Sequence, residues 1–154
     1  MQLYRFSPIQ DKQQLFGAVE YVAAKTSELC KKILGKTFPI NSLTIFSHYP
    51  DEYEYLIRIL NELGKYYNEN NWLRVVLDRP IKLGKNTITH LRIRKPDPYR
   101  MQVGCNDFEV KDYMEFKEKY LSAHPKNLRV MSRPEYEMIE LFDPDYDVLA
   151  YVVS

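Results

Sequence analysis

Five ionisable side chains lie at strand-like spacing in the middle of the chain, on both sides of a Pro-containing connection. They are His90, Arg92, Arg94, Asp107 and Glu109. Alternate side chains of a β-strand share one face, so the three basic groups would point the same way. Guanidinium groups bind carboxylates and phosphates through a rigid fork of donors, whereas His, Asp and Glu can also bind metal ions. The spacing therefore predicts a polar site where two strands meet.

Two predicted strands carry these residues. Thr87–Arg94 alternates polar and apolar residues from Leu91 onward, and Asp107–Val110 alternates in the same way. The Pro96-Asp97-Pro98 run ends the first strand, because Pro cannot donate a hydrogen bond to a sheet and restricts the residue before it. If the polar faces of both strands meet, they form one concavity, and Cys105 lies close to its edge.

Several interpretations of these residues remain open. They bind an anionic or polar small ligand, or Arg94 forms an ion pair with Asp107 or Glu109 that merely joins two parts of the chain, or they face bulk solvent. Buried ion pairs often add little net stability, although losing one partner costs about 3–5 kcal/mol. A residual metal site would use His90, Asp107 and Glu109, and it requires Arg94 to swing away because its charge repels a cation.

The first half of the chain predicts a helix followed by a β-α-β-β order. The helix begins at Ser7-Pro8 as cap and first turn and ends at Gly35. Ser42–Phe46 is a strand whose polar face carries Ser42 and Thr44, and both are included in the predicted ligand site. The elements that follow are a helix capped by Asp51 with Glu54, a short strand near Lys65–Tyr67, and strands at Trp72–Leu77 and Thr87–Arg94.

The second half repeats this order. Asp112 with Glu115 predicts a helix cap, and an apolar stripe at helical spacing continues to Leu121. Three further strands are predicted at Leu128–Met131, Tyr136–Phe142 and Asp147–Val153. The charged residues Arg133, Glu135, Glu137 and Glu140 are interpreted as a solvated strand face.

We therefore predict an α+β protein with paired βαβββ modules that form a cupped mixed sheet, preceded by an N-terminal helix. The expected organisation is a single domain over residues 1–154. It consists of a helical extension at 1–39, a first module at 40–97 and a second module at 105–154.

Composition excludes several classes of protein. The chain has 154 residues with 22 Lys and Arg against 21 Asp and Glu, so it lacks the dense positive charge of a nucleic-acid-binding module. No apolar run approaches the roughly 18 residues of a membrane span, and Met1–Ile9 shows no signal-peptide pattern. Cys30 and Cys105 are too isolated for a disulfide framework. We expect a cytoplasmic protein with reduced thiols and neither nucleic-acid nor membrane partners.

Paired βαβββ modules are the building plan of the vicinal oxygen chelate, or glyoxalase-like, superfamily, which this chain resembles. FDPDYDVLAY at Phe142–Tyr151 is similar to the Asp-Pro hairpin and last ligand-bearing strand of that family. The closer resemblance is to YecM-type proteins, which share a helical N-terminus, a Pro-closed strand such as LDRPI at Leu77–Ile81, and a connection such as LRIRKPDPYRMQVGCNDFEV. Those proteins are regarded as metal binders without a settled reaction.

The resemblance implies a metal site, but this sequence departs from its ligand positions. The family has a His where Asn41-Ser42 stands, a Glu where Arg94 stands, a His where Asp107 stands, and a last ligand near Ala150. A cation cannot use Arg, which stays protonated. We therefore expect that the familial metal site is lost and that no cofactor is bound, with a divalent metal as the alternative.

The sequence thus predicts a glyoxalase-like protein that binds a small anionic or polar ligand in the cup between its modules, without the usual metal. One alternative is a metal-dependent lyase, isomerase or dioxygenase with an atypical ligand set. Another is a non-catalytic structural or interaction protein. The resemblance also implies that a homodimer can form.

Overall fold

The fold is α+β and is built on one mixed sheet of eight strands. The computed structural model describes residues 3–69 and 72–154. The helices are α1 (Lys12–Leu34), α2 (Pro50–Leu63) and α3 (Tyr113–Tyr120). The strands are β1 (Ile40–Phe46), β2 (Gly64–Glu69), β3 (Trp72–Leu83), β4 (Asn86–Arg94), β5 (Gly104–Phe108), β6 (Leu128–Ser132), β7 (Glu137–Leu141) and β8 (Val148–Val153). Within the described ranges no helix is long and apolar enough to cross a membrane.

The sheet consists of two similar halves in the order β2-β3-β4-β1-β5-β8-β7-β6. In each half the first and last strands of the module pair in parallel, β1 with β4 and β5 with β8, and the remaining pairs are antiparallel. The halves join through the antiparallel pair β1–β5, where Thr44 lies opposite Cys105. This arrangement confirms the predicted paired βαβββ modules of a glyoxalase-like fold.

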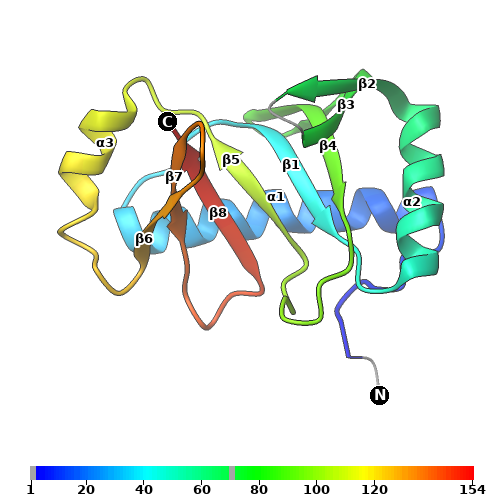
Figure 1. Ribbon diagram of the computed structural model, residues 1–154, viewed down its shortest axis with the longest axis horizontal. Coiled ribbons are helices and arrows are strands. Elements are labelled where there is room, and N and C mark those ends of the chain that lie inside the picture. Colours follow the sequence, from blue (N-terminus) through cyan, green and yellow to red (C-terminus); the bar gives the residue numbers. More distant parts are fainter. Residues whose placement is uncertain (1–2, 70–71) are drawn as a thin grey trace.

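Helix α1 lies across the back of the central strands, and α2 and α3 lie at opposite ends of the molecule (Figure 1). The apolar stripe of α1 packs against β1, β5 and β8 through fully buried side chains such as Leu15, Val19 and Val22. Gly35 ends the helix as predicted, because it adopts a left-handed conformation with φ of 77° that favours glycine. The predicted start is wrong: Asp11, and not Ser7, accepts a hydrogen bond from the Gln14 backbone N–H at 2.8 Å.

The other two helix starts differ in their capping. In α3 the Asp112 carboxylate accepts from the Glu115 N–H at 3.1 Å, which confirms the predicted cap. In α2 the predicted Asp51 cap is wrong, since Pro50 occupies the first turn and Tyr49 provides no side-chain cap. Glu52 is buried there instead and accepts hydrogen bonds from the backbone of His48 and Ile9, which fastens the N-terminal segment to the start of α2.

Strand β5 begins three residues earlier than the sequence predicts and ends at Phe108. The reason is a close approach to β1: a Cβ atom added at Gly104 would lie 2.3 Å from the Thr44 carbonyl oxygen, so only glycine fits. Beyond the strand, the Glu109 N–H donates to the Pro39 carbonyl at 3.0 Å. Glu109 therefore leaves the strand, and the prediction that it shares a strand face with Asp107 is wrong.

Candidate functional site

The concave face of the sheet carries a row of polar side chains that crosses both modules. Thr44 of β1 lies opposite Arg92 of β4 on one side and Cys105 of β5 on the other. One pair further along, Asp107 of β5 lies opposite Tyr151 of β8. The residues between them in sequence face α1 and the main core, so strand alternation places these five side chains on one face.

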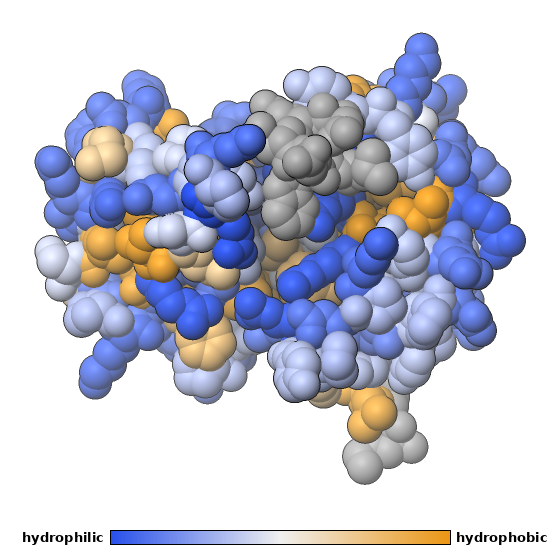
Figure 2. Space-filling view, viewed as in Figure 1, coloured by the Kyte–Doolittle hydropathy of each residue, from blue (hydrophilic) through white to orange (hydrophobic). Residues whose placement is uncertain are grey.

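This face forms a cavity of about 410 Å³, within the size range of small-molecule sites. Its charged side chains are the guanidinium groups of Arg74, Arg92, Arg94, Arg100 and Arg133, and Asp107 is the one acidic side chain among the described lining residues. Its apolar lining includes Phe46, Met131, Met138 and Val153. In Figure 2 the surface is hollowed between the half that carries β6 and β7 and the half that carries β2 to β4, and hydrophilic side chains border the hollow.

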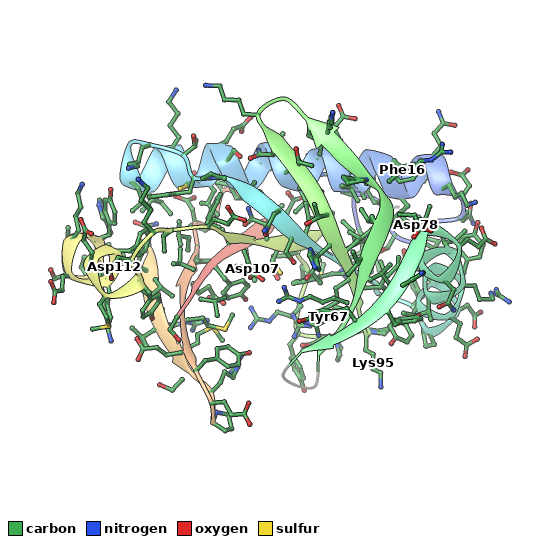
Figure 3. The ribbon with its side chains drawn as sticks, turned by 90° about the horizontal axis from the view of Figure 1, so that it is seen from above. Phe16, Tyr67, Asp78, Lys95, Asp107 and Asp112 are labelled. Carbon is green, nitrogen blue, oxygen red and sulfur yellow. The ribbon has the colours of Figure 1, made fainter. Side chains whose placement is uncertain are left out.

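The two modules are linked inside the cavity by Arg74 and Asp107. Arg74 of β3 donates to the Asp107 Oδ2 at 3.0 Å and to the Ser42 Oγ at 3.0 Å. Both charged side chains keep a little over a quarter of their exposure. Burial raises the pKa of the Asp107 carboxyl, and the charges of Arg74 and Arg92 act against that rise. Figure 3 shows Asp107 near the middle of the molecule, between the two halves of the sheet.

Arg94 has a different partner from the one that the sequence suggests. It donates to Asp97 at 3.1 Å, three residues further along the chain, and its guanidinium lies 4.8 Å from the centre of the Phe46 ring. The predicted ion pair of Arg94 with Asp107 or Glu109 is therefore wrong. Arg92 lies deeper: burial lowers the pKa of its guanidinium, and the neighbouring Arg74 and Arg94 lower it further. Crowded cations of this kind favour a bound anion.

Three predicted site residues lie outside the cavity lining. Ser42 is buried beneath it and bonds to the lining residue Arg74. His90 shares the strand face of Arg92, but it bonds to the Thr89 hydroxyl at 2.8 Å and packs edge-on to Tyr67. Glu109 is exposed and accepts a hydrogen bond from Asn41. The proposed metal ligands His90, Asp107 and Glu109 are thus not brought together, and no cluster of three His, Cys, Asp or Glu side chains in the described part of the chain could hold a metal ion.

The donor chemistry at the family's ligand positions does not fit a metal ion. The first strand supplies the hydroxyl groups of Ser42 and Thr44, and β4 supplies Arg92 and Arg94. Ala150, near which the resemblance places the last ligand, is fully buried on the opposite face, whereas the adjacent Tyr151 lines the cavity. The positive guanidinium groups that surround the hydroxyl and carboxylate oxygens would repel a divalent cation.

Glu140 of β7 is an unexpected part of the site. Only 2% of the residue is exposed, so its interpretation as a solvated strand residue is wrong. Its carboxylate accepts from Arg129 at 2.7 Å and from the Tyr151 hydroxyl at 2.9 Å. Burial and the nearby Cys105 and Glu140 raise the pKa of Tyr151, so the phenol stays protonated. The Tyr151 ring also packs with Phe46 and Leu149 to form the apolar floor of the cup.

The sequence analysis brought together Ser42, Thr44, Arg92, Arg94 and Asp107, and it missed several functional candidates. Arg74 gave a usable signal, because it interrupts the apolar strand Trp72–Leu77 between Leu73 and Val75. Arg100 gave none, since it lies in the irregular connection after Pro98. Tyr151 lies on the same strand as the expected ligand position, one residue later than Ala150.

Comparison with known proteins supports the fold. The structural-genomics protein EC4020 superposes with a TM-score of 0.65 at 11% sequence identity, covering 99% of this chain and 92% of that chain. The fold is shared. A weaker similarity is to a glyoxalase/bleomycin resistance protein/dioxygenase superfamily member from Vibrio splendidus 12B01, with a TM-score of 0.49 at 8% identity, covering 73% of this chain and 95% of that chain. Another is to 2,2',3-trihydroxybiphenyl 1,2-dioxygenase from Sphingomonas wittichii strain RW1, with a TM-score of 0.45 at 10% identity, covering 75% of this chain and 40% of that chain. No family model and no curated protein matches the sequence.

Proposed function

We propose that this protein binds a small organic anion in the cup between its two modules, without the metal ion that is usual for the resembled family. The observation that supports this function most strongly is the charge of the lining: among its described residues, five arginines accompany one acidic side chain. Arg74 compensates Asp107, and Asp97 lies beside Arg94. Arg100 and Arg133 form no ion pair with any carboxylate among the described residues. An anion would reduce the repulsion among these cations and gain charge-assisted hydrogen bonds.

The test is calorimetric titration of the purified protein with inorganic phosphate, propionate and 3-phenylpropionate, at low and at physiological ionic strength. We expect binding that weakens with added salt, because part of the attraction comes from exposed charges. Arg94→Met should weaken binding at least about tenfold, since it removes one bidentate donor with little change in volume. Arg58→Met, on the exposed surface of α2, is the matched control and should bind as the wild type does.

Metal analysis of protein purified without a His tag tests the second part of the proposal. We expect substoichiometric Zn, Mn, Fe and Ni, together with anion affinities that chelator treatment does not change. A stoichiometric metal whose removal abolishes ligand binding would instead support a metal-dependent lyase, isomerase or dioxygenase. The absence of any heat or thermal shift with all three anions would reject the binding function.

A further inference from the structure

The two walls of the cup differ in chemistry, and this difference restricts the kind of anion that fits. On the wall formed by the first module, β3 and β4 present Arg74, Arg92 and Arg94. On the opposite wall, Met131 of β6 and Met138 of β7 are directly paired across the strands and line the same cavity. Both methionines are half-buried and pack against the floor cluster that contains Tyr151. A fully hydrated ion such as phosphate could bond to the arginines, including Arg133 beside β6, but it would leave the two methionines without an apolar partner.

Methionine side chains are flexible and polarisable, and they adapt to apolar ligands of irregular shape. An apolar group that covers Met131 and Met138 would remove their remaining exposed surface from water, which is favourable in proportion to the area buried. The anionic group of the same molecule would then lie at the arginines, because the two walls enclose one cavity. The ligand that uses both walls is therefore an amphipathic organic anion.

Tyr151 adds a directional requirement. Its hydroxyl hydrogen is donated to Glu140 at 2.9 Å, and Glu140 is held in turn by Arg129 at 2.7 Å. A phenol has one hydrogen and two lone pairs, so the Tyr151 oxygen can still accept but has no second hydrogen to donate. Tyr151 lines the cavity and keeps 7% of its surface exposed, so a molecule bound there would contact this side chain.

Resting on the proposed anion-binding function, we infer that the ligand is an amphipathic organic anion that carries an O–H or N–H donor, and that Tyr151 is the residue that selects for this donor. The carboxylate or phosphate binds the arginines, the apolar body contacts Met131 and Met138, and the donor bonds to the Tyr151 oxygen. Ligands that lack the donor leave a buried acceptor without a partner, which is the basis of discrimination.

The experiment compares carboxylates that differ by one feature at a time. Propionate has the anion alone, lactate adds a donor, 3-phenylpropionate adds an apolar body, and both enantiomers of 3-phenyllactate and of 3-hydroxy-3-phenylpropionate add both. Dissociation constants are measured by calorimetry at fixed salt. We expect 3-phenylpropionate to bind at least about 10-fold more tightly than propionate, and one of the hydroxylated phenyl acids to bind about 3- to 10-fold more tightly still.

Two variants assign these gains to residues. Tyr151→Phe should remove the gain from the hydroxyl group and leave the affinity for 3-phenylpropionate unchanged, whereas Met138→Ala should reduce the gain from the phenyl group. Tyr55→Phe, which removes the hydroxyl of a half-buried tyrosine of α2 outside the cavity lining, is the matched control and should keep both gains. Circular dichroism and the thermal midpoint of each variant verify that it is folded.

The outcomes separate this inference from the proposed function. Equal affinities for propionate and 3-phenylpropionate would overturn the amphipathic ligand while leaving anion binding intact. A hydroxyl gain that survives in Tyr151→Phe, or that is lost in Tyr55→Phe, would overturn the role of Tyr151. If none of the acids and no phosphate binds, the proposed function fails first.

Discussion

Arg74 of β3 and Asp107 of β5 bond to each other at 3.0 Å across the cup, although β4 and β1 separate their strands in the sheet. The sheet is curved enough for one side chain from each module to meet. The hydroxyl of Ser42, on the intervening strand β1, accepts a hydrogen bond from the same guanidinium. This pair links the two modules inside the cavity and compensates Asp107, the one acidic side chain among the lining residues that the structure describes.

Replacing Arg74 with Met should destabilise the protein by about 2–3 kcal/mol near neutral pH. This loss is somewhat below the 3–5 kcal/mol of a fully buried pair because both side chains stay partly exposed. The orphaned Asp107 would have a still higher pKa, and a carboxyl with a raised folded-state pKa stabilises the fold at low pH and loses that contribution as pH rises. Urea unfolding at about pH 7 and about pH 4.5 measures the difference.

In that experiment the double variant Arg74→Met with Asp107→Leu is the control. It removes both charges and should recover much of the stability at neutral pH. Equal losses for Arg74→Met at the two pH values would contradict the ion-pair account and point to lost packing of the arginine stem instead.

Replacing the buried amide of Asn106 with an apolar side chain should stabilise the protein. It is 1% exposed on the helix-facing side of β5, and neither its amide oxygen nor its nitrogen has a hydrogen-bond partner among the described residues. Asn106→Leu has a similar shape and removes this desolvation cost, so we expect about 1–2 kcal/mol of added stability in chemical denaturation. Asn106→Asp is the contrasting variant and should destabilise strongly. Destabilisation by Leu would reveal a buried water that satisfies the amide.

His48 should make stability depend on pH. Its ring bonds to the Ser7 hydroxyl at 2.7 Å and to the Gln102 carbonyl at 3.1 Å, and Tyr4 stacks on it. Burial lowers the pKa of this histidine from its ordinary 6.5, although Glu52 acts in the opposite direction. Neutral His48 is therefore favoured in the folded state, so its stabilisation is complete above about pH 6.5 and is lost as pH falls.

The measurement for His48 is the free energy of unfolding as a function of pH, from about pH 8 down to about pH 5. His48→Gln stays neutral throughout and should show a shallower decline, by up to about 1.4 kcal/mol per pH unit in the steepest region. Parallel curves for wild type and variant would show that other groups cause the decline.

Two glycines should respond to alanine in opposite directions. At Gly104 the new Cβ would lie 2.3 Å from the Thr44 carbonyl oxygen and 3.1 Å from Val22, so the β1–β5 pair must separate. We expect Gly104→Ala to cost about 2–3 kcal/mol or to prevent folding. At Gly17, inside α1, the Cβ meets nothing within 4 Å, and Gly17→Ala should add about 0.5–1 kcal/mol. Thermal melts of both variants decide the matter, and a neutral Gly104→Ala would contradict the close approach.

The sequence was sufficient to predict the fold because its signals are local. Each signal depends on a few neighbouring residues: the alternation of strands, the helix-ending glycine at position 35 and the Asp112 cap. The order of the predicted strands and helices recurs in the second half of the chain, which implied two modules. The register of β5 could not be predicted from local pattern. Asp107–Val110 alternates well, but the close approach at Gly104 and the bond from Glu109 to Pro39 decide where the strand begins and ends.

The candidate site was predictable only in part for the same reason. Periodicity placed Arg92 and Arg94 on the cup face, but the choice of partner depends on which strands the sheet brings together. Asp107 bonds to Arg74 and Glu140 bonds to Tyr151, and in both cases the partner comes from another strand. A buried carboxylate such as Glu140 looks like a surface residue until its partners are known.

Helix α1 packs against β1, β5 and β8 and so spans the junction where the modules meet. We expect this packing to fix the angle between the two walls before a ligand binds. Binding would then require little ordering of the backbone, and the entropic cost of association would fall mainly on the ligand. Among related ligands, we expect similar association rate constants, with differences in affinity arising mainly from the dissociation rate constants.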